Sequence, residues 1–296
     1  MIKCNHLCHD REHECHLCAS EDPVFSQIDQ RDYWHLLEAL TGKSRAQLIA
    51  RPDIELTPEQ RAQLAQWIYQ HVHEHKPIQY IIGNVPFGSL TINIEPPVLI
   101  PRPETEEWVL DLIAQLSAAH EVPRTIVDLG TGSGCIALTL AAAFPDAHVT
   151  AVDIADHALA CARANAACNK ISNVNFITAD MFSLIPGLCA DLVVSNPPYI
   201  SDQEYQDLDL AVTRWEDKGA LVADQDGYAY ITALSRVCAR HVVVEIGHLQ
   251  GQRARDIFLQ AGFDSVTLKR DYAGKDRVVH ARRSSHSCSA LMQSNG

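Results

Sequence analysis

The residues best suited to do chemistry follow the apolar segment 191–195, and they are Asn196, Pro197, Pro198 and Tyr199. The prolines lack a backbone N–H and stiffen the chain, so nearby carbonyl groups are free to accept hydrogen bonds. The Asn196 side-chain carbonyl and the Pro197 backbone carbonyl can accept both hydrogens of a planar NH2 group, on which Tyr199 can stack. We expect Asn196, Pro197 and Tyr199 to be catalytic and Pro198 to help bind the acceptor. An amide or aryl amine nitrogen is a poor nucleophile, so its reaction depends on such positioning.

A glycine-rich turn earlier in the chain is suited to bind a ligand through backbone groups. Gly130, Gly132 and Gly134 alternate with Thr131 and Ser133, directly after an apolar segment. Glycine permits positive φ and close approach to the backbone, and the amides of a following helix then face the ligand. The spacing Gly-x-Gly-x-Gly differs from the Gly-x-Gly-x-x-Gly of dinucleotide sites. Alone, such a turn is also compatible with a plain tight turn.

Acidic residues follow the next two predicted strands. Asp153 lies about 20 residues after the glycines, where a carboxylate can accept hydrogen bonds from both hydroxyls of a ribose. Asp180 can accept one from an adenine amine while Met181 covers the ring, although a helix N-cap is an equal alternative for Asp180. With Asn196, these residues favour S-adenosylmethionine over NAD as the cofactor.

Ligands of an open α/β sheet bind at the carboxyl ends of its strands, so these residues must lie there. Helices are expected at about 104–117, 135–144 and 155–168, and strands at 125–129, 148–152, 174–178, 191–195, 241–246, 265–269 and 277–281. The alternation predicts a doubly wound, mostly parallel, seven-stranded Rossmann-like sheet with helices on both faces. The last two strands flank a turn and predict an antiparallel end.

The first third of the chain has a different pattern. Residues 23–78 are expected to form a small helical domain that docks the substrate; Thr57 is a predicted N-cap there. Residues 79–100 change to period two, which predicts a β-hairpin linker that turns at Gly88 and Ser89. The catalytic domain is expected to span residues 101–283.

Both ends of the chain differ from a globular composition. Residues 1–22 are crowded with cysteine and histidine, and two cysteine pairs, separated by six residues, superficially resemble zinc ligands. That gap is shorter than structural zinc sites use, so we expect a disordered tail with no metal, a zinc site being the alternative. The serine-rich residues 284–296 are also expected to be a disordered tail.

Composition excludes several classes of protein. The chain of 296 residues suggests about two domains. Its 24 basic and 37 acidic residues give a net charge of −13, which disfavours direct DNA binding. We find no apolar run that could span a membrane and no secretory signal. Beyond the first 20 residues the cysteines are scattered singly, and Cys135, Cys161 and Cys168 are expected to be buried in helices, which favours a cytoplasmic location.

Five segments together resemble the HemK/PrmC family of protein-(glutamine-N5) methyltransferases. They occur in the family's order within residues 23–283, and residues 215–221 match more loosely; the five are residues 100–106, 130–134, 196–200, 245–251 and 271–279. The resemblance implies methyl transfer from S-adenosylmethionine to the glutamine of a Gly-Gly-Gln motif in peptide chain release factors.

The same resemblance implies roles for individual residues. Arg102 and Glu104 would have a supporting role beside the cofactor site, and residues 196–199 would bind the glutamine. The cofactor residues would be Gly130, Thr131, Gly132, Ser133, Gly134, Asp153, Met181 and Asn196.

Other functions are compatible with parts of the pattern. An adenine amino-methyltransferase could use the same Asn-Pro-Pro-Tyr segment, but such an enzyme flips a base and needs a basic recognition region. A glutamine methyltransferase that acts on a ribosomal protein is an alternative that the sequence distinguishes only poorly from one that acts on release factors. A binding protein without turnover could keep the fold, although the presence of Gly130, Asp153 and Asn196 together argues against it.

Overall fold

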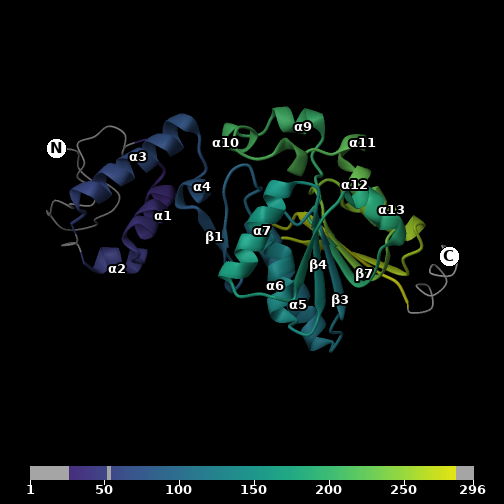
Figure 1. Cartoon of the computed structure of the whole chain (residues 1–296). Coiled ribbons are helices and arrows are strands. Elements are labelled where there is room, and N and C mark those ends of the chain that lie inside the picture. The colour runs from purple at the N-terminus through teal and green to yellow at the C-terminus, as the bar shows by residue number, and fades with distance from the viewer. Residues whose placement is uncertain (1–26, 52–54, 285–296) are drawn as a thin grey trace. The chain divides into compact units, whose positions relative to one another are not determined.

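The computed structural model describes residues 27–51 and 55–284, and the chain divides into two compact units between Gly83 and Asn84 (Figure 1). The expectations for residues 1–22 and 284–296 lie outside the described residues, except at Ser284, whose N–H donates to Asp264. Within the described part, no helix is long and apolar enough to cross a bilayer. The same part contains no cluster of three or more His, Cys, Asp or Glu side chains that could hold a metal ion.

The first unit is helical and contains α1 (Gln30–Thr41), α2 (Arg45–Ala50), α3 (Pro58–Glu74) and α4 (Ile78–Ile82). The expected N-cap at Thr57 is confirmed, because its side chain accepts from the backbone N–H of Gln60 in a capping box. A single apolar core, which includes Trp34, Leu37 and Leu64, holds the unit together. These helices therefore have the caps and the buried stripe that their sequence predicts.

The prediction that residues from 79 onward form a strand is wrong for residues 79–82, which are helical. The Pro77 carbonyl accepts from the backbone N–H of Tyr80 and Ile81, which starts α4. Gly83 ends this helix with φ of 88°. A short apolar run fits either period, and here the packing of Ile81 and Ile82 against the helical core decides the outcome.

The hairpin follows in the second unit, as β1 (Asn84–Phe87) and β2 (Leu90–Asn93), antiparallel across the predicted turn. Asn165 of α7 (Asp156–Cys168) and Asn169, the C-cap of this helix, both bind the hairpin. Asn165 both donates to the Asn93 carbonyl and accepts from its N–H, at 2.9 and 2.8 Å. Asn169 donates to the Thr91 carbonyl at 2.9 Å. The hairpin is therefore built onto the second unit.

A seven-stranded sheet forms the centre of this unit, in the order β5-β4-β3-β6-β7-β9-β8. β3 to β7 are parallel, and β9 is antiparallel to both of its neighbours, which confirms the predicted antiparallel end. The strands are β3 (Thr125–Leu129), β4 (His148–Asp153), β5 (Val174–Thr178), β6 (Cys189–Ser195), β7 (Cys238–Glu245), β8 (Ser265–Arg270) and β9 (Asp276–Arg282).

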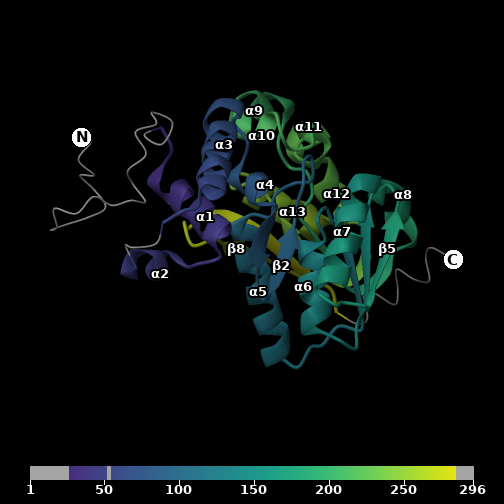
Figure 2. The same ribbon diagram turned by 60° about the vertical axis from the view of Figure 1, so that its left-hand side comes forward.

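Helices cover both faces of the sheet, as expected. Figure 2 shows α5 (Pro103–Ala118), α6 (Cys135–Ala143) and α7 together on one face. The other face packs against α8 (Met181–Leu184), α12 (Ala229–Leu234) and α13 (Gly251–Gln260) in one continuous core. Shorter helices lie in the connections, namely α9 (Asp202–Gln206), α10 (Leu210–Thr213) and α11 (Asp224–Gly227), with 3-10 turns at Ile185–Gly187 and Lys218–Ala220.

The helical cysteines were expected to be buried. Cys135 and Cys161 are buried, whereas Cys168 is exposed. Cys168 is the last residue of α7, so no further turn of this helix follows it.

Candidate active site

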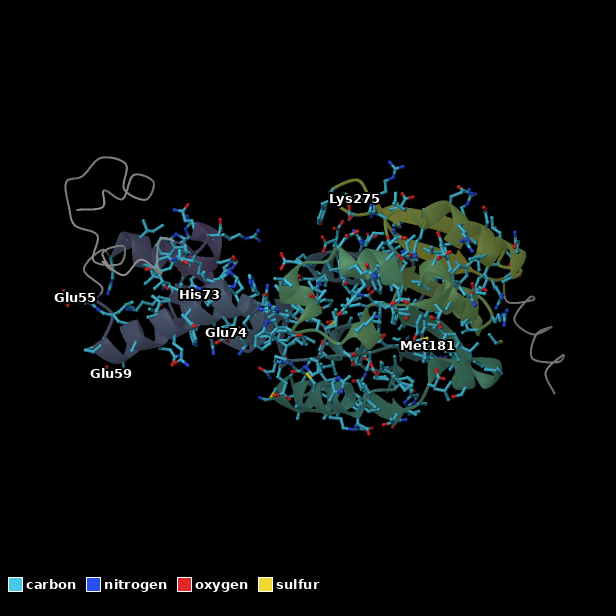
Figure 3. All side chains as sticks on the ribbon, turned by 90° about the horizontal axis from the view of Figure 1, so that it is seen from above. Glu55, Glu59, His73, Glu74, Met181 and Lys275 are labelled. Atoms are coloured by element: carbon cyan, nitrogen blue, oxygen red, sulfur yellow. The ribbon has the colours of Figure 1, made fainter. Side chains whose placement is uncertain are left out.

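A cavity lies at the carboxyl ends of β3, β4, β5 and β6. Met181, which Figure 3 labels, is one of the residues that line it. Parallel strands present these ends at one edge of the sheet, so residues distant in sequence meet there. Seven of the predicted site residues line the cavity: Gly130, Gly132, Asp153, Asp180, Met181, Asn196 and Pro198. Thr131, Ser133, Gly134, Pro197 and Tyr199 are not among the lining residues.

The glycine turn has the backbone that its composition predicts. Gly130, Gly132 and Gly134 have φ of 77°, 55° and 83°. The backbone N–H groups of Gly130 and Thr131 both donate to the Val152 carbonyl at 2.9 Å, which ties the turn to β4. A Cβ on Gly134 would lie 3.0 Å from the Cβ of Ala162 in α7, so this glycine permits close helix packing instead of lining the cavity.

Thr131 and Ser133 hold the glycine turn through hydrogen bonds to residues outside it. The Thr131 hydroxyl donates to the buried Asp128 at 2.6 Å. Burial raises the pKa of Asp128 to about 7. The Ser133 carbonyl accepts from Asn165 at 2.9 Å. Both residues therefore help to hold the turn, and their contact with the cofactor stays a prediction.

Asp153 is held in a fixed orientation beside the turn. One carboxylate oxygen accepts from the Gly132 N–H at 2.8 Å and the other from the Ala155 N–H at 2.9 Å. Each oxygen keeps a free lone pair, so the group can still accept two hydrogen bonds from a ligand.

Asp180 caps the short helix α8 by accepting from the Phe182 N–H at 3.0 Å. The N-cap alternative is thus confirmed, and the carboxylate also lines the cavity.

The charge of the cavity distinguishes between ligand classes. Its acidic lining residues are Asp153, Asp180 and Asp217, and no lysine or arginine lines it in the described chain. A pyrophosphate would be repelled here, whereas a ligand that carries a sulfonium and an ammonium group would be attracted.

Sequence reasoning missed Ile154, which lines the cavity and is 69% exposed. An apolar residue directly after a strand-ending acid is the signal that could have found it.

The acceptor segment, residues 196–199, is anchored to a buried carboxylate. Asn196 Nδ2 donates to the Thr105 hydroxyl at 3.2 Å, and that hydroxyl donates to Glu245 at 2.7 Å. Trp108 Nε1 donates to the same carboxylate oxygen at 2.8 Å. The Tyr199 hydroxyl lies 3.5 Å from the other oxygen. Burial raises the pKa of Glu245 and of Tyr199. Sequence reasoning left Thr105 and Trp108 unused.

The backbone of the acceptor segment is fixed as well. Gln250 Nε2 donates to the Tyr199 carbonyl at 3.0 Å and to the Gly227 carbonyl at 3.2 Å. A Cβ on Gly227 would lie 2.2 Å from the backbone carbonyl oxygen of Tyr199, so only glycine fits there. The Ile200 N–H and carbonyl pair with the backbone of residues 221 and 223.

An ion pair joins two segments that border the cavity, residues 97–102 and 216–217. Arg102 Nη2 donates to both oxygens of Glu216, at 2.7 and 2.6 Å, and Glu216 is 5% exposed. The Asp217 N–H donates to the Pro97 carbonyl at 2.9 Å. Arg102 therefore holds a segment beside the cavity, while Glu104 is half-buried and does not line the cavity. A supporting role beside the cofactor stays a prediction for both residues.

This sheet order, with an antiparallel seventh strand and an acidic cavity at the glycine turn, is the architecture of a methyltransferase. The family model for the methyltransferase small domain matches residues 111–237, and the model for the PrmC N-terminal domain matches residues 26–83. The catalytic domain of hMettl16, solved with a MAT2A 3′UTR hairpin, has the same fold, at a TM-score of 0.50 and 17% identity over 77% of this chain and 82% of that chain.

Curated relatives define the family more narrowly. Release factor glutamine methyltransferase of Salmonella typhimurium is 38% identical, with 87% of this chain and 93% of the relative covered. The Escherichia coli protein of the same name is 37% identical (92% and 96%), and that of Flavobacterium psychrophilum is 34% identical (86% and 93%). The chain belongs to the family of release factor glutamine methyltransferases.

Proposed function

We propose that this chain transfers a methyl group from S-adenosylmethionine to the side-chain amide nitrogen of the glutamine in the Gly-Gly-Gln motif of peptide chain release factors, and so supports translation termination. The observation that carries the proposal is the position of Asn196. It lines the acidic cavity and begins the donor-free Asn-Pro-Pro-Tyr segment. The relatives that share most of the chain's length carry this activity in their names.

The residues of the cavity fit the cofactor. Asp153 can accept from the two ribose hydroxyls, Asp180 from the adenine amine, and Met181 can cover the ring. Gly130 and Gly132 both line the cavity at positive φ, and without a Cβ they permit close approach of the ligand to the backbone. When bound, the cofactor supplies an electrophilic methyl group on a sulfonium.

The acceptor residues work by orientation. The Asn196 side-chain carbonyl and the Pro197 carbonyl accept the two amide hydrogens, and Tyr199 stacks on the flat carboxamide. The nitrogen then presents its lone pair to the methyl group, so that the reaction depends on placement and electrostatics. No residue is assigned as a general base, because the surplus proton can leave to water after transfer.

A nucleic-acid acceptor is disfavoured on charge. The net charge is −13, and three carboxylates line the cavity that the acceptor must reach. The likeness to an RNA-bound methyltransferase domain concerns the fold alone. A basic protein partner suits this surface better, and we propose that the helical unit, described at residues 27–51 and 55–83, docks it in the cytoplasm.

Transfer can be tested with a cofactor that carries tritium in its methyl group. We expect label to enter a purified release factor and to be absent from the variant whose Gly-Gly-Gln glutamine is replaced by alanine. Ribosomal proteins and an adenine-containing oligonucleotide serve as competing acceptors. Label in either of these, and none in the release factor, would refute the proposal.

A further inference from the structure

Glu245 ends β7, one residue beyond Val244, which pairs with Ser195 at the end of β6, where the acceptor segment begins. It is a carboxylate with 1% exposure. The charged groups that act on it are Arg277, which favours its ionised form, and Glu104, which opposes it. Arg277 is itself held by Asp271, at 3.0 Å. Burying a carboxylate costs free energy unless the group is hydrogen-bonded and lies near a cation.

The direction of these hydrogen bonds follows from the donors and from an ionised Glu245, the form that burial opposes and Arg277 favours. The indole N–H of Trp108 can only donate, and an ionised carboxylate can only accept. The single proton of the Thr105 hydroxyl therefore goes to Glu245, and its oxygen is left to accept. Only the Nδ2 side of the Asn196 amide can satisfy that oxygen, which leaves Oδ1 for the cavity.

We propose that Glu245, Thr105 and Trp108 are positioning residues that hold the Asn196 amide with Oδ1 toward the acceptor nitrogen. This inference rests on the proposed function and specifies how its acceptor site is oriented. A reversed amide would present N–H groups to an NH2 substrate and repel it. Without the relay the two orientations differ only by rotation of the side chain, and X-ray density separates them poorly.

Thr105→Val tests the relay with little change of shape. The productive amide orientation would then leave Nδ2–H without a partner, so we expect kcat to fall by about tenfold to a hundredfold, with the dissociation constant of the cofactor unchanged. Thr105→Ser keeps the hydroxyl and should restore most of the rate. The matched control is Thr139→Val, because the Thr139 hydroxyl is buried in α6 and has no hydrogen-bond partner in the structure; its kcat should stay at the wild-type value.

The carboxylate is tested by a pair of variants. In Glu245→Gln, Trp108 forces the glutamine oxygen to stay on its side, so Thr105 still donates in the same direction and most of kcat should remain. Glu245→Met fills the same space without an acceptor and should lower kcat at least as much as Thr105→Val. A Glu245→Gln variant as slow as Glu245→Met would show that the negative charge, and not the direction of the bonds, matters. That outcome would overturn the proposal.

An observation without turnover separates this inference from the proposed function. In protein labelled with 15N-asparagine, the Asn196 side-chain amide protons should be protected from exchange in the wild type and lose protection in Thr105→Val but not in Thr139→Val. Protection with no methyl transfer to a release factor would refute the proposed function alone. Equal exchange in all three proteins, with transfer intact, would refute the relay alone.

Discussion

Asp153→Ala is the sharpest test of the cofactor site. Each carboxylate oxygen already accepts one backbone N–H, so it can offer one further hydrogen bond to the ribose. Two such bonds at a half-exposed carboxylate contribute about 1 kcal/mol each, or about 2 kcal/mol together. The dissociation constant of S-adenosylmethionine should therefore rise about thirtyfold. Isothermal titration calorimetry measures it directly.

The control for this experiment is Asp156→Ala. Asp156 lies three positions further along, is exposed, and does not line the cavity, although it carries the same charge. Its removal should leave the dissociation constant near the wild-type value. Since Asp153 also holds the N–H groups of Gly132 and Ala155, circular dichroism must show that the variant is folded. An unchanged affinity in folded Asp153→Ala would refute the assignment of the ribose to this residue.

Three further outcomes are expected. Asn196→Ala should abolish methyl transfer while calorimetry still detects cofactor binding; an unchanged rate would remove Asn196 from the mechanism. Arg102→Ala leaves the buried Glu216 without its cation, so urea unfolding should show a loss of about 3 kcal/mol, and a loss near zero would contradict the buried pair. Burial raises the pKa of Asp128 from 3.8 to about 7, so the folded state holds its proton more tightly and unfolding free energy should fall as pH rises from about 4 to 7. Asp128→Asn should weaken that fall, because its Oδ1 can accept from Thr131 and Ala137 while its NH2 takes the place of an oxygen that has no hydrogen-bond partner among the described residues; an identical pH profile would refute this.

The sequence predicts the sheet well because its strands are short, apolar and separated by helices with clear periodicity. It predicts the cavity at Asp153, Asp180 and Asn196 because strand ends are recognisable and parallel strands place them together. It fails where two periods fit the same residues, as at Ile81 and Ile82, whose packing against a helical core only the fold supplies.

The supporting residues are less predictable for a physical reason. Thr105 and Glu245 are 140 positions apart in the chain, and neither has a local pattern that reveals the partner. Gly134 belongs to the glycine turn by spacing, yet the neighbour that requires a glycine is Ala162 on another helix. Such roles depend on which surfaces the folded chain brings into contact.

Gln250, Gly227 and Thr105 hold the acceptor segment from separate elements, so its shape is settled before any substrate arrives. A segment with so little conformational freedom has little entropy to lose on binding. The cost of ordering then falls on the incoming peptide, and a mobile glycine-rich loop can be bent to fit where a rigid helix cannot. Selection among glutamines thus begins with the flexibility of the partner, before any side chain next to the glutamine is recognised.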